Sequence, residues 1–580
     1  MGFRAPVRDI AFALNDVAGL NALLAAGAFP EFDSETCLQI LTAAGEFAVD
    51  VLAPLNRMGD IEGARFENGR VFAAPGFADA YRKFIDGGWT SLNAPAEFGG
   101  QGLPRAVAIA VFEMVTAANM SFGLCPMLSE AGIHLLTVHG TPRQKEIYLP
   151  KLVSGEWTGT MNLTEAQAGS DLALIRTRAE PDGDKYRVSG QKIFITWGDH
   201  DCADNIVHLV LARLPGAPEG TKGISLFLVP KHLPDANGNA GVANALRPLS
   251  IEHKLGIHAS PTCVMGYEAA EAELVGAPHQ GLALMFTMMN AARLNVGAQG
   301  VGIAERAYQQ ARDYALERRQ GRSSWSDEVP ARIVDLPDVR RTLLLMKAKT
   351  EAARAICLAT AVAADRAEHG RSESEREQAK LREELLVPVA KAWSTDVGVE
   401  VASLGIQVHG GAGFIEETGA AQFYRDARIA PIYEGTNGVQ AIDLAGRKLS
   451  LAGGRAVRAL LTEMRSTLPD LDGSIRETLG SAIAAAERAT DWLILNRGSN
   501  DALAGATAYL KLLGDVTGGW MLAKAARIAS HSSDEDYARG KLALARIYAS
   551  QVLTAAPGLA DAVCAGAAEL EAGVAALAPD

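Results

Sequence analysis

The sequence predicts a multidomain fold of α and β structure, in which a small β domain lies between two helical domains and a further helical domain follows. Three changes of pattern along the chain predict this order. Apolar side chains recur at mostly helical spacing in residues 35–155, and residues 156–275 hold short β-rich runs separated by Gly and Pro. Long helical segments return in residues 276–450, residues 451–580 are Ala-rich and helical in period, and residues 1–34 form an N-terminal extension.

The first helical domain has a recognisable start. Ser34 and Glu35 precede a helix face that contains Leu38, Leu41 and Val51. Two further helices are expected in "VAIAVFEMVTAAN" and "TPRQKEIYLPKLV", and the Gly-rich "PAEFGGQGLP" predicts a turn before them.

The next region is expected to be an all-β insert, folded as a small barrel or a sandwich. Its strands are predicted in "DKYRVSGQKIFIT", "NIVHLVLARL", "KGISLFLVP" and "SPTCVMGYEAAE". The "SGQ" between "YRV" and "KIFIT" predicts a hairpin turn within the first run.

Three long segments after the β insert predict a bundle of antiparallel helices. The third, "EQAKLREELLVPVAKAWSTDVGVEVASLGIQVHG", is expected to be interrupted at Pro388. Gly453 and Gly454 break the chain before the last region, which contains the polar turn "SHSSDED" and no cofactor motif. That region is predicted to be a helical packing domain. A β domain between helical ones creates a cleft, which is a favoured place for a ligand.

Composition excludes several classes of function. Hydrophobic residues make up 48% and charged residues 21%, which is typical of a soluble globular protein, and the net charge of −13 argues against nucleic acid as a partner. The 6 cysteines are scattered without a CxxC pair, which argues against a zinc site or a disulfide framework and suits the cytoplasm. The first twenty residues resemble neither a secretory signal nor a membrane-spanning helix.

Two segments carry candidate chemistry. In "MNLTEAQAGSDL" (161–172), small residues expose backbone N–H groups while Thr164 and Ser170 add hydroxyls, which suits a flavin edge or a phosphate; a plain Gly-Ser turn has the same spacing. In "PIYEGTNGVQ" (431–440), Glu434 is either the acid of a helix start, with Thr436 as the N-cap of "NGVQAIDLAGRKL", or the base of an enzyme. Walker and GxGxxG motifs are absent at strand–helix junctions, so NAD is not expected as a direct cofactor.

Five segments, in order, resemble the acyl-CoA dehydrogenase family of flavoproteins. "LTEAQAGSD" is similar to the family's "TEPxAGSD", with Ala166 or Gln167 in place of Pro, and "EHKLGIHASPTC" is similar to "KLGxRxSxT". "NAPAEFGGQGLP" and "KIFITWG" resemble the N-domain turn and the strand beside the flavin. "QVHGGAGFIEETGAAQFYRDARIAPIYEGTNGVQ" resembles the C-terminal signature with its "RDxRIxxIYEGT" core. The resemblance covers roughly residues 35–450.

The resemblance implies a helical N-domain, a middle β-barrel and a C-terminal four-helix bundle, with FAD in the cleft. "APVRDIAFALNDV", "RRQGR" and the helical region after residue 450 resemble the long subfamily. Candidate substrates are therefore 3-methylmercaptopropionyl-CoA and straight-chain fatty acyl-CoA, within fatty acid β-oxidation.

The resemblance also assigns roles to residues. Glu434 is the expected base, with its own backbone N–H and the ribityl 2′-hydroxyl of FAD holding the thioester oxygen. Some relatives carry the base just before an Arg in the bundle; Ala292 stands there, before Arg293, and cannot remove a proton. Expected substrate contacts are Ser170, Arg293, Tyr433 and Gly435, and no metal site is expected. Expected FAD contacts are Met161, Leu163, Thr164, Gly169, Ser170, Phe194, Thr196, Arg318, Gln320, Gln407, Gly410, Gly411 and Thr436.

Three of these assignments leave details open. Phe194 stands where relatives usually have Trp, and Trp197 is close by, so either ring could cover the flavin. Arg318 or Arg319 could pair with the FAD pyrophosphate, because guanidinium suits phosphate. Gly410 and Gly411 are expected to meet the adenine side of FAD from a second subunit, and His409 is expected to be structural.

The leading hypothesis is an FAD-dependent dehydrogenase that passes electrons to electron-transfer flavoprotein, acts in the cytoplasm as a homodimer and does not insert into a membrane. An acyl-CoA oxidase, which reoxidises its flavin with O₂, shares the expected base and fold. A non-enzymatic scaffold on the same fold would be expected to lack the base, as would a flavin monooxygenase, and Glu434 counts against both.

Overall fold

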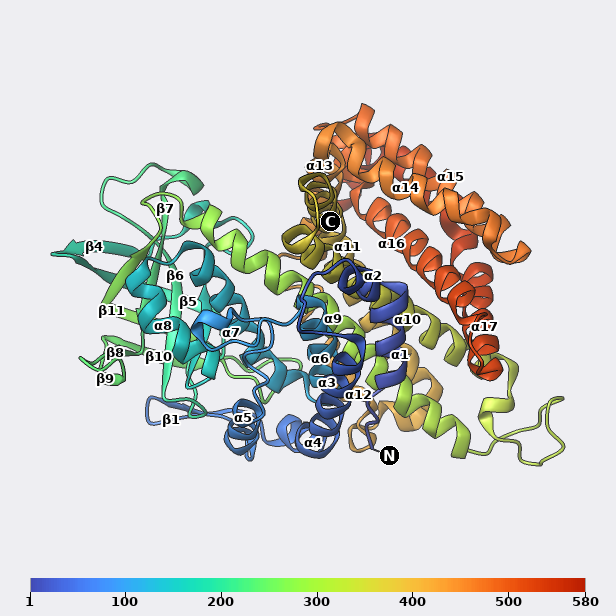
Figure 1. Cartoon of the computed structure of the whole chain (residues 1–580), viewed down its shortest axis with the longest axis horizontal. Helices are drawn as coiled ribbons and strands as arrows, with labels where there is room; N and C mark the ends of the chain where they lie inside the picture. The colour runs from blue at the N-terminus through green and yellow to red at the C-terminus, as the bar shows by residue number, and fades with distance from the viewer. Residues whose placement is uncertain (1, 579–580) are drawn as a thin grey trace. The chain divides into compact units, whose positions relative to one another are not determined.

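The chain forms two compact units, and the computed structural model describes residues 2–578 (Figure 1). The helical unit comprises Met1–Gly45, Arg105–Ala117 and Arg293–Asp580, and the barrel unit comprises Glu46–Pro104 and Ala118–Ala292. The barrel unit is therefore inserted, along the sequence, between pieces of the helical unit. The predicted N-terminal helical domain is divided between the two.

Seven strands of the barrel unit form one sheet: β3 (Trp157–Asn162), β4 (Arg178–Asp182), β5 (Lys185–Thr196), β6 (Asn205–Arg213), β7 (Ile224–Pro230), β10 (Leu246–Ile251) and β11 (Thr262–Val275). Their order is β10-β11-β5-β4-β6-β3, and β7 pairs with both β11 and β6. This double pairing closes β11, β5, β4, β6 and β7 into a ring. The β insert is therefore a barrel, which decides between the two architectures that the sequence left open.

Two apolar cores hold the barrel unit together. The inside of the barrel is filled by side chains such as Val188, Val210, Phe227 and Met265. A second core packs β3 and β6 against helices, and the large ring of Trp157 lies in it. The remaining elements of the unit are α4 (Ala53–Glu62), α5 (Phe77–Asp86), α7 (Met120–His139), α8 (Pro142–Ser154), β1 (Arg65–Glu67), β2 (Arg70–Phe72), β8 (His232–Pro234) and β9 (Ala240–Ala243).

The hairpin predicted at "SGQ" is wrong. β5 runs through these residues without turning, and it pairs with β11 on one side and β4 on the other. The turn lies earlier, where Asp182 pairs with Lys185 around Gly183 at φ 63°. Gly190 is required for another reason: a Cβ on it would lie 2.6 Å from Thr177 Oγ1, so the glycine permits a close approach rather than a turn.

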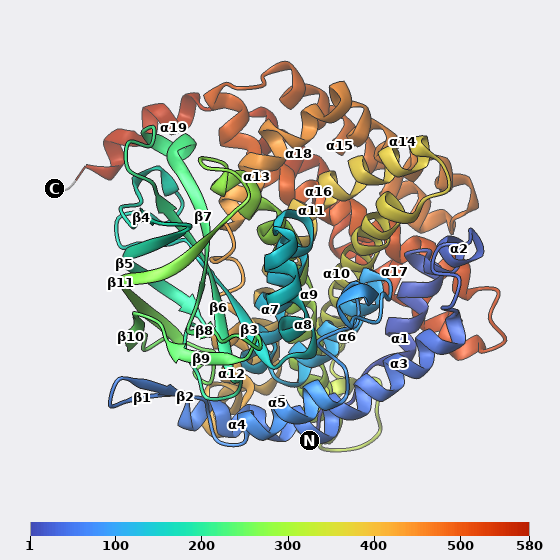
Figure 2. The same cartoon turned by 60° about the vertical axis from the view of Figure 1, so that its left-hand side comes forward.

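The helical unit is built around three long helices, α9 (Gly281–Glu317), α10 (Pro337–His369) and α11 (Glu373–His409). α10 and α11 run side by side in both Figures 1 and 2. α9 and α11 also approach closely, since a Cβ on Gly300 would lie 2.3 Å from Ser394 O. Shorter helices complete this part: α1 (Val7–Phe12), α2 (Leu20–Ala25), α3 (Ser34–Phe47), α6 (Arg105–Ala118), α12 (Ala420–Ala427) and α13 (Asn437–Gly446), with a π-helical turn over Ala13–Val17.

The expected interruption at Pro388 does not occur. α11 continues from Glu373 to His409 with Pro388 buried inside it. Packing of the surrounding apolar residues of α11, including Leu385 and Val389, compensates for the hydrogen bond that a proline cannot donate.

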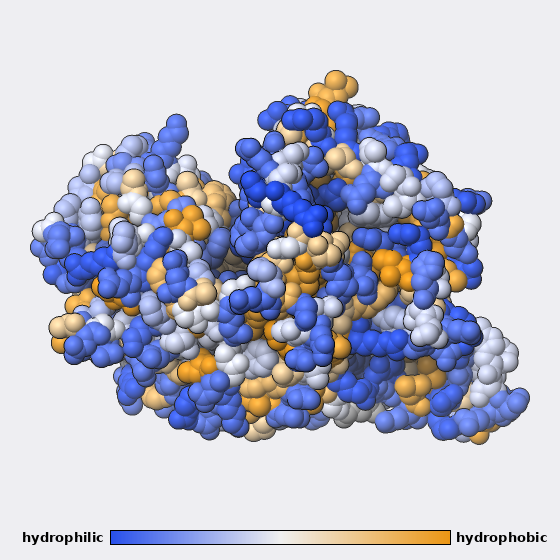
Figure 3. All heavy atoms as spheres, viewed as in Figure 1, coloured by the Kyte–Doolittle hydropathy of each residue, from blue (hydrophilic) through white to orange (hydrophobic). Residues whose placement is uncertain are grey.

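The C-terminal region is a set of helices, as its periodicity predicted: α14 (Arg455–Thr467), α15 (Gly473–Leu495), α16 (Asn500–Ala529), α17 (Glu535–Gln551), α18 (Ala556–Cys564) and α19 (Ala568–Ala572). α16 packs on the bundle, where Trp393 donates its indole N–H to Asp515 Oδ1 at 2.9 Å. Gly514 makes room for that indole, because a Cβ would lie 2.3 Å from Trp393 Cδ1. On the face drawn in Figure 3, hydrophilic residues predominate over these helices.

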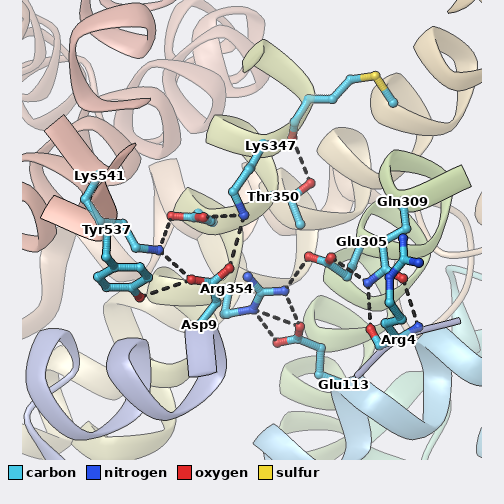
Figure 4. Close-up of polar contacts among 12 residues, drawn as sticks. Arg4, Asp9, Glu113, Glu305, Gln309, Lys347, Thr350, Arg354, Tyr537 and Lys541 are labelled. Carbon is cyan, nitrogen blue, oxygen red and sulfur yellow. Dashed lines mark hydrogen bonds and ion pairs between the residues drawn. The ribbon is translucent and has the colours of Figure 1, made fainter. Parts of the chain in front are cut away.

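A network of buried charges crosses the helical unit (Figure 4). Arg354 of α10 donates to Glu113 of α6 at 2.7 Å and to Glu305 of α9 at 2.8 Å, and its side chain is 1% exposed. Asp9 of α1 accepts from Lys347 of α10 at 3.1 Å and from Lys541 of α17 at 2.9 Å. The network therefore joins the N-terminal extension, the bundle and the C-terminal helices.

Two features of residues 2–578 bear on broad function. One helical run, Ser34–Glu62, is long and apolar enough to cross a membrane, a test that core helices of soluble proteins also pass. Within the same residues, no group of three or more His, Cys, Asp or Glu side chains is arranged to hold a metal ion.

Candidate active site

The predicted base lies in the corner between α12 and α13. Thr436 is the N-cap of α13, and its Oγ1 accepts a hydrogen bond from the Val439 N–H at 3.2 Å, which confirms the predicted helix start. Before the cap, Glu434 and Gly435 both have positive φ, at 55° and 85°. Glycine adopts this conformation readily, whereas for Glu434 it costs about 1 kcal/mol. The surrounding contacts must therefore hold the corner in place.

The pKa of the Glu434 carboxyl group suits a base that acts near neutral pH. It lies deep in the protein, although part of the side chain is accessible to solvent. Burial raises its pKa to about 7, against the opposing effect of the positive charges of Arg293 and Lys391. A carboxylate with this pKa is a far stronger base than one in water, and at neutral pH a large fraction is still ionised.

Arg293 of α9 contacts the corner directly. Its guanidinium Nε donates to the backbone carbonyl of Glu434 at 3.3 Å, and the residue is 5% exposed. Burial lowers the pKa of Arg293, while Asp443 and Glu434 oppose that effect. Ala292, directly before it on α9, is fully buried in the barrel-unit core and carries no group that could remove a proton.

Tyr433 and Gly435 flank the base with fixed geometry. The Tyr433 hydroxyl donates to Gln299 Oε1 on α9, and burial raises the pKa of Tyr433 further above its usual value. A Cβ on Gly435 would lie 2.8 Å from Gln440 Nε2, so position 435 requires glycine for space as well as for its φ. The structure thus brings Arg293, Tyr433, Glu434 and Gly435 together.

In the barrel unit, the loop after β3 is fixed by a buried ion pair. Lys192 of β5 is fully buried and donates to Glu165 Oε1 at 2.8 Å and to the Leu163 carbonyl at 2.9 Å. Glu165 also accepts from Arg176 N at 2.7 Å and Thr177 Oγ1 at 2.6 Å. Burial opposes ionisation of Glu165, but Lys192 and these donors outweigh it and lower the pKa to about 2.

This ion pair places the expected flavin-binding residues of the loop beside the end of β5. The Ile193 N–H donates to the Thr164 carbonyl at 2.9 Å. Met161, Leu163 and Thr164 are half-buried, whereas Gly169 and Ser170 are exposed and nothing lies within 4 Å of a Cβ placed on Gly169. The loop therefore offers an open backbone edge on a rigid base.

The structure distinguishes the two candidate rings near this loop. Phe194 lies where the register between β5 and β11 shifts, and its φ of 59° turns the ring outward so that it is 59% exposed. Trp197 is 1% exposed and its indole N–H donates to the Ser121 carbonyl at 3.2 Å. Of the two rings, Phe194 is the one available to a planar ligand. Thr196, at the end of β5, is half-buried beside it in sequence.

The remaining expected FAD contacts lie on other parts of the helical unit. Gln407 lies near the C-terminal end of α11, about 24 Å along the helix from Lys391, which contacts the Glu434 corner, and Gly410 and Gly411 directly follow the helix. Gly410 has φ 60°, and Cβ atoms on Gly410 and Gly411 would meet nothing within 4 Å. The structure therefore separates these residues from the base within one chain.

The segment after α9 carries the other expected phosphate contacts. Arg318 and Gln320 are exposed, whereas Arg319 is ion-paired with Glu328 at 2.5 Å. The Nδ1–H of His409 donates to the Gly405 carbonyl at 2.7 Å, and the ring stacks on Tyr314, which fits the structural role expected for it.

Sequence reasoning did not find Glu165, Lys192, Gln299 or Lys391. Glu165 and Lys192 lie inside the motifs "LTEAQAGSD" and "KIFIT", so their place in the sequence was a signal. Gln299 and Lys391 lie in the middle of long helices, where a polar residue carries no signal in one sequence.

Four family models match the chain in order. They describe the acyl-CoA dehydrogenase N-terminal domain (residues 34–156), the middle domain (160–269), the C-terminal domain (279–449) and an acetyl-CoA dehydrogenase C-terminal-like domain (460–572). Together they span most of the sequence, including the region after residue 450.

Similar proteins support the same assignment. The chain is 48% identical over 569 residues to 3-methylmercaptopropionyl-CoA dehydrogenase of Ruegeria pomeroyi, covering 95% of this chain and 96% of the relative. It is 31% identical to the broad-specificity linear acyl-CoA dehydrogenase FadE5 of Mycobacterium tuberculosis, covering 95% of each. Its fold is similar to that of an acyl-CoA dehydrogenase from Bacillus anthracis complexed with FAD, with a TM-score of 0.75 and 21% identity over 95% of this chain and 92% of that one. The chain belongs to the acyl-CoA dehydrogenase family of oxidoreductases.

Proposed function

We propose that the protein oxidises an acyl-CoA thioester between its α and β carbons, giving the trans-2-enoyl-CoA, and that Glu434 removes the α proton. The observation that carries the proposal is the Glu434 corner, where burial raises the pKa of a carboxyl group to about 7 and contacts from Arg293 and Lys391 hold the strained backbone in place. The α proton of a thioester is too weakly acidic for a carboxylate in water, so the base must be desolvated.

The thioester oxygen must be held while the α proton leaves, because negative charge develops on it. We assign this role to the backbone N–H of Glu434. Arg293 and Lys391 hold the carbonyls of Glu434 and Gly435, which fixes the two peptide planes that follow the Glu434 N–H and limits the freedom of the residue that carries it. A fixed donor stabilises the developing enolate without having to reorient during the reaction.

The residues of the chain fit FAD as the cofactor. The exposed Phe194 ring offers a face for a planar isoalloxazine, and the open loop backbone at Gly169 lies on a base fixed by Lys192 and Glu165. Bound FAD supplies the acceptor for the β hydride at N5. We assign Met161, Leu163, Thr164, Ser170, Thr196 and Thr436 as further contacts on the isoalloxazine side.

A change at Lys192 is expected to weaken FAD binding. Lys192→Met removes the hydrogen bonds to Glu165 and Leu163 that hold the loop on β5, and it leaves Glu165 buried without its cation. We expect the dissociation constant of FAD to rise by about 10-fold, measured from flavin fluorescence released on dilution. Lys185→Met, on the same strand in a pair with Glu273, should leave FAD retention unchanged; equal loss in both variants would contradict the role of Lys192.

The reaction should depend on pH through Glu434. Because burial raises the pKa of this carboxyl group to about 7, the base is protonated and inactive below that pH and ionised above it. We therefore expect kcat/KM to rise with an apparent pKa near 7 when it is measured between about pH 5 and pH 9. A value of kcat/KM that stayed level down to about pH 5 would show that the base is not a carboxyl group of raised pKa.

We propose 3-methylmercaptopropionyl-CoA as the first substrate to test, supported by the 48% identity to the dehydrogenase of that name. Straight-chain acyl-CoAs remain the comparison set, since the FadE5 relative is a linear acyl-CoA dehydrogenase. An anaerobic screen that follows flavin absorbance tests the whole proposal: at least one acyl-CoA should bleach the flavin stoichiometrically. Failure of every chain length, with FAD bound, would contradict it.

We propose electron-transfer flavoprotein as the electron acceptor, as expected from the resemblance. Protein reduced by substrate should be reoxidised rapidly by electron-transfer flavoprotein and slowly by air. Fast reoxidation by air would show instead an acyl-CoA oxidase.

We further propose a homodimer in the cytoplasm. The support is an apolar pair beside Gly410 and Gly411: Phe414 is 85% exposed and Ile415 is 52% exposed. A second copy covering this pair would bring the adenine side of its FAD to Gln407, Gly410 and Gly411, with Arg318 and Gln320 assigned to the phosphates. Light scattering of the holoprotein should give twice the mass of the chain.

A further inference from the structure

One cation beside the Glu434 corner has no assigned role. Lys391 lies in the middle of α11 and is fully buried. Its ammonium donates to the Gly435 carbonyl at 2.8 Å and to Asn437 Oδ1 at 2.8 Å. Both direct partners are neutral oxygens, although burying a lysine is costly and is usually compensated by an ion pair. This suggests that the charge of Lys391 serves the neighbouring carboxylate.

Asn437 extends the connection between the corner and α11. Its Nδ2 lies within hydrogen-bond distance of the Ala392 carbonyl (3.0 Å), Thr395 Oγ1 (3.0 Å) and Asp396 Oδ1 (2.8 Å). Asn437 is the first residue of α13, three positions after the base. The amide of Asn437 therefore ties the start of α13 to one turn of α11, and Lys391, the residue directly before that turn, contacts Asn437 Oδ1.

The corner is thus held from two helices. Arg293 of α9 holds the carbonyl of Glu434, and Lys391 of α11 holds the carbonyl of Gly435. These are the two consecutive residues with positive φ, and a strained segment persists only where its surroundings over-determine it. Arg293 contacts the base residue itself, while Lys391 acts on the residues that follow.

Five charged groups of the helical unit act on Glu434 or on the two cations beside it. They are Arg293 of α9, Lys391 and Asp396 of α11, Asp443 of α13 and Arg447 at its end. Burial lowers the pKa of Lys391 to about 7, while Glu434 and Asp396 oppose that effect, so Lys391 and Glu434 titrate as a coupled pair.

We propose that Lys391 is a positioning residue for the base: its ammonium fixes the Glu434–Asn437 corner on α11, and its positive charge stabilises the ionised carboxylate of Glu434. The inference rests on the proposed function. The pKa of Glu434 then depends on residues of two helices. Burial opposes ionisation of the carboxyl group, and the cations Arg293 of α9 and Lys391 of α11 favour it.

The test compares three variants of the holoprotein. Lys391→Met removes the charge and the two hydrogen bonds, so kcat should fall by about 10-fold or more and the acidic limb of kcat/KM should move up by about one pH unit. Asn437→Ala removes the bonds of this side chain to α11 but keeps the charge of Lys391 and its bond to the Gly435 carbonyl, so kcat should fall while the acidic limb stays in place. Lys349→Met is the matched control, because this buried lysine of α10 pairs with Glu400 away from the corner; it should change neither quantity.

The outcomes separate the inference from the proposed function. If the parent protein is bleached by an acyl-CoA and Lys391→Met keeps the parent pH profile, the charge role of Lys391 is wrong and the proposed function stands. If Lys391→Met does not fold, Asn437→Ala still decides the positioning role, since an unchanged kcat overturns it. If no acyl-CoA bleaches the parent protein, the proposed function itself fails.

Discussion

Glu434→Gln should retain yellow, bound FAD and lose bleaching by acyl-CoA, with the rate of flavin reduction falling by about 10³-fold or more. Gln is nearly isosteric with Glu, and the backbone contacts of the corner, from Arg293 to the Glu434 carbonyl and from Lys391 to the Gly435 carbonyl, do not involve the carboxyl group. The variant therefore removes the base while the corner keeps its shape. Stopped-flow flavin absorbance under anaerobic conditions measures the effect.

A matched control is available close by in the sequence. Glu417 is an exposed acid in the turn before α12, so Glu417→Gln should reduce flavin at the parent rate. Bleaching of Glu434→Gln at the same rate as Glu417→Gln would show that another group removes the proton. Loss of FAD from Glu434→Gln would assign the residue a structural role instead.

Arg354→Met should strongly destabilise the helical unit. The Arg354 side chain is 1% exposed and holds the carboxylates of Glu113 and Glu305, which come from two other helices (Figure 4). Methionine fills much of the volume but leaves two acids facing each other in the interior. Breaking a buried pair in this way costs about 3–5 kcal/mol, which should lower Tm by about 4–7 °C in a thermal unfolding scan.

The loss of stability should be smaller at low pH. Without Arg354, burial and mutual repulsion raise the pKa values of Glu113 and Glu305 above those of the unfolded chain. The folded variant then binds more protons than the unfolded chain, so its stability falls as pH rises through this range. Arg539→Met, which breaks an exposed pair with Asp536, should shift Tm little at any pH. Equal Tm changes in the two variants would argue against an energetic role of the buried network.

The order of domains could be predicted from sequence because it depends on local periodicity. Helical spacing, β-rich runs and the Thr436 N-cap are each visible within about a dozen residues. The barrel could not be distinguished from a sandwich, because closure depends on β7 pairing with two strands, one of them β11, far along the chain. The prediction of a hairpin at "SGQ" was wrong for a similar reason. Gly190 is required there because Thr177 packs closely against it, and not because the chain turns.

Some residues of the candidate site could likewise be predicted from the sequence, and others could not. Glu434 could be singled out because its motif is contiguous, and its neighbours Tyr433 and Gly435 followed from it. Lys391 and Gln299 could not, since each meets the corner only after long helices are packed together. Lys192 and Glu165 are 27 positions apart, and nothing in either motif says that both are buried.

The bond between Asp9 and Lys541 has a consequence for synthesis of the chain. The two residues are 532 positions apart, and a ribosome adds about 5–20 residues per second. The N-terminal helix is therefore made about 30–100 s before the lysine that binds it, while every residue of the barrel unit is made in between. The barrel unit can fold during that interval, whereas the apolar face of α1 and the following π-helical turn, with Ile10 and Leu14, cannot be fully covered before α16 has been made. Nascent chains of this protein should consequently need protection at their N-terminal end until translation is nearly complete.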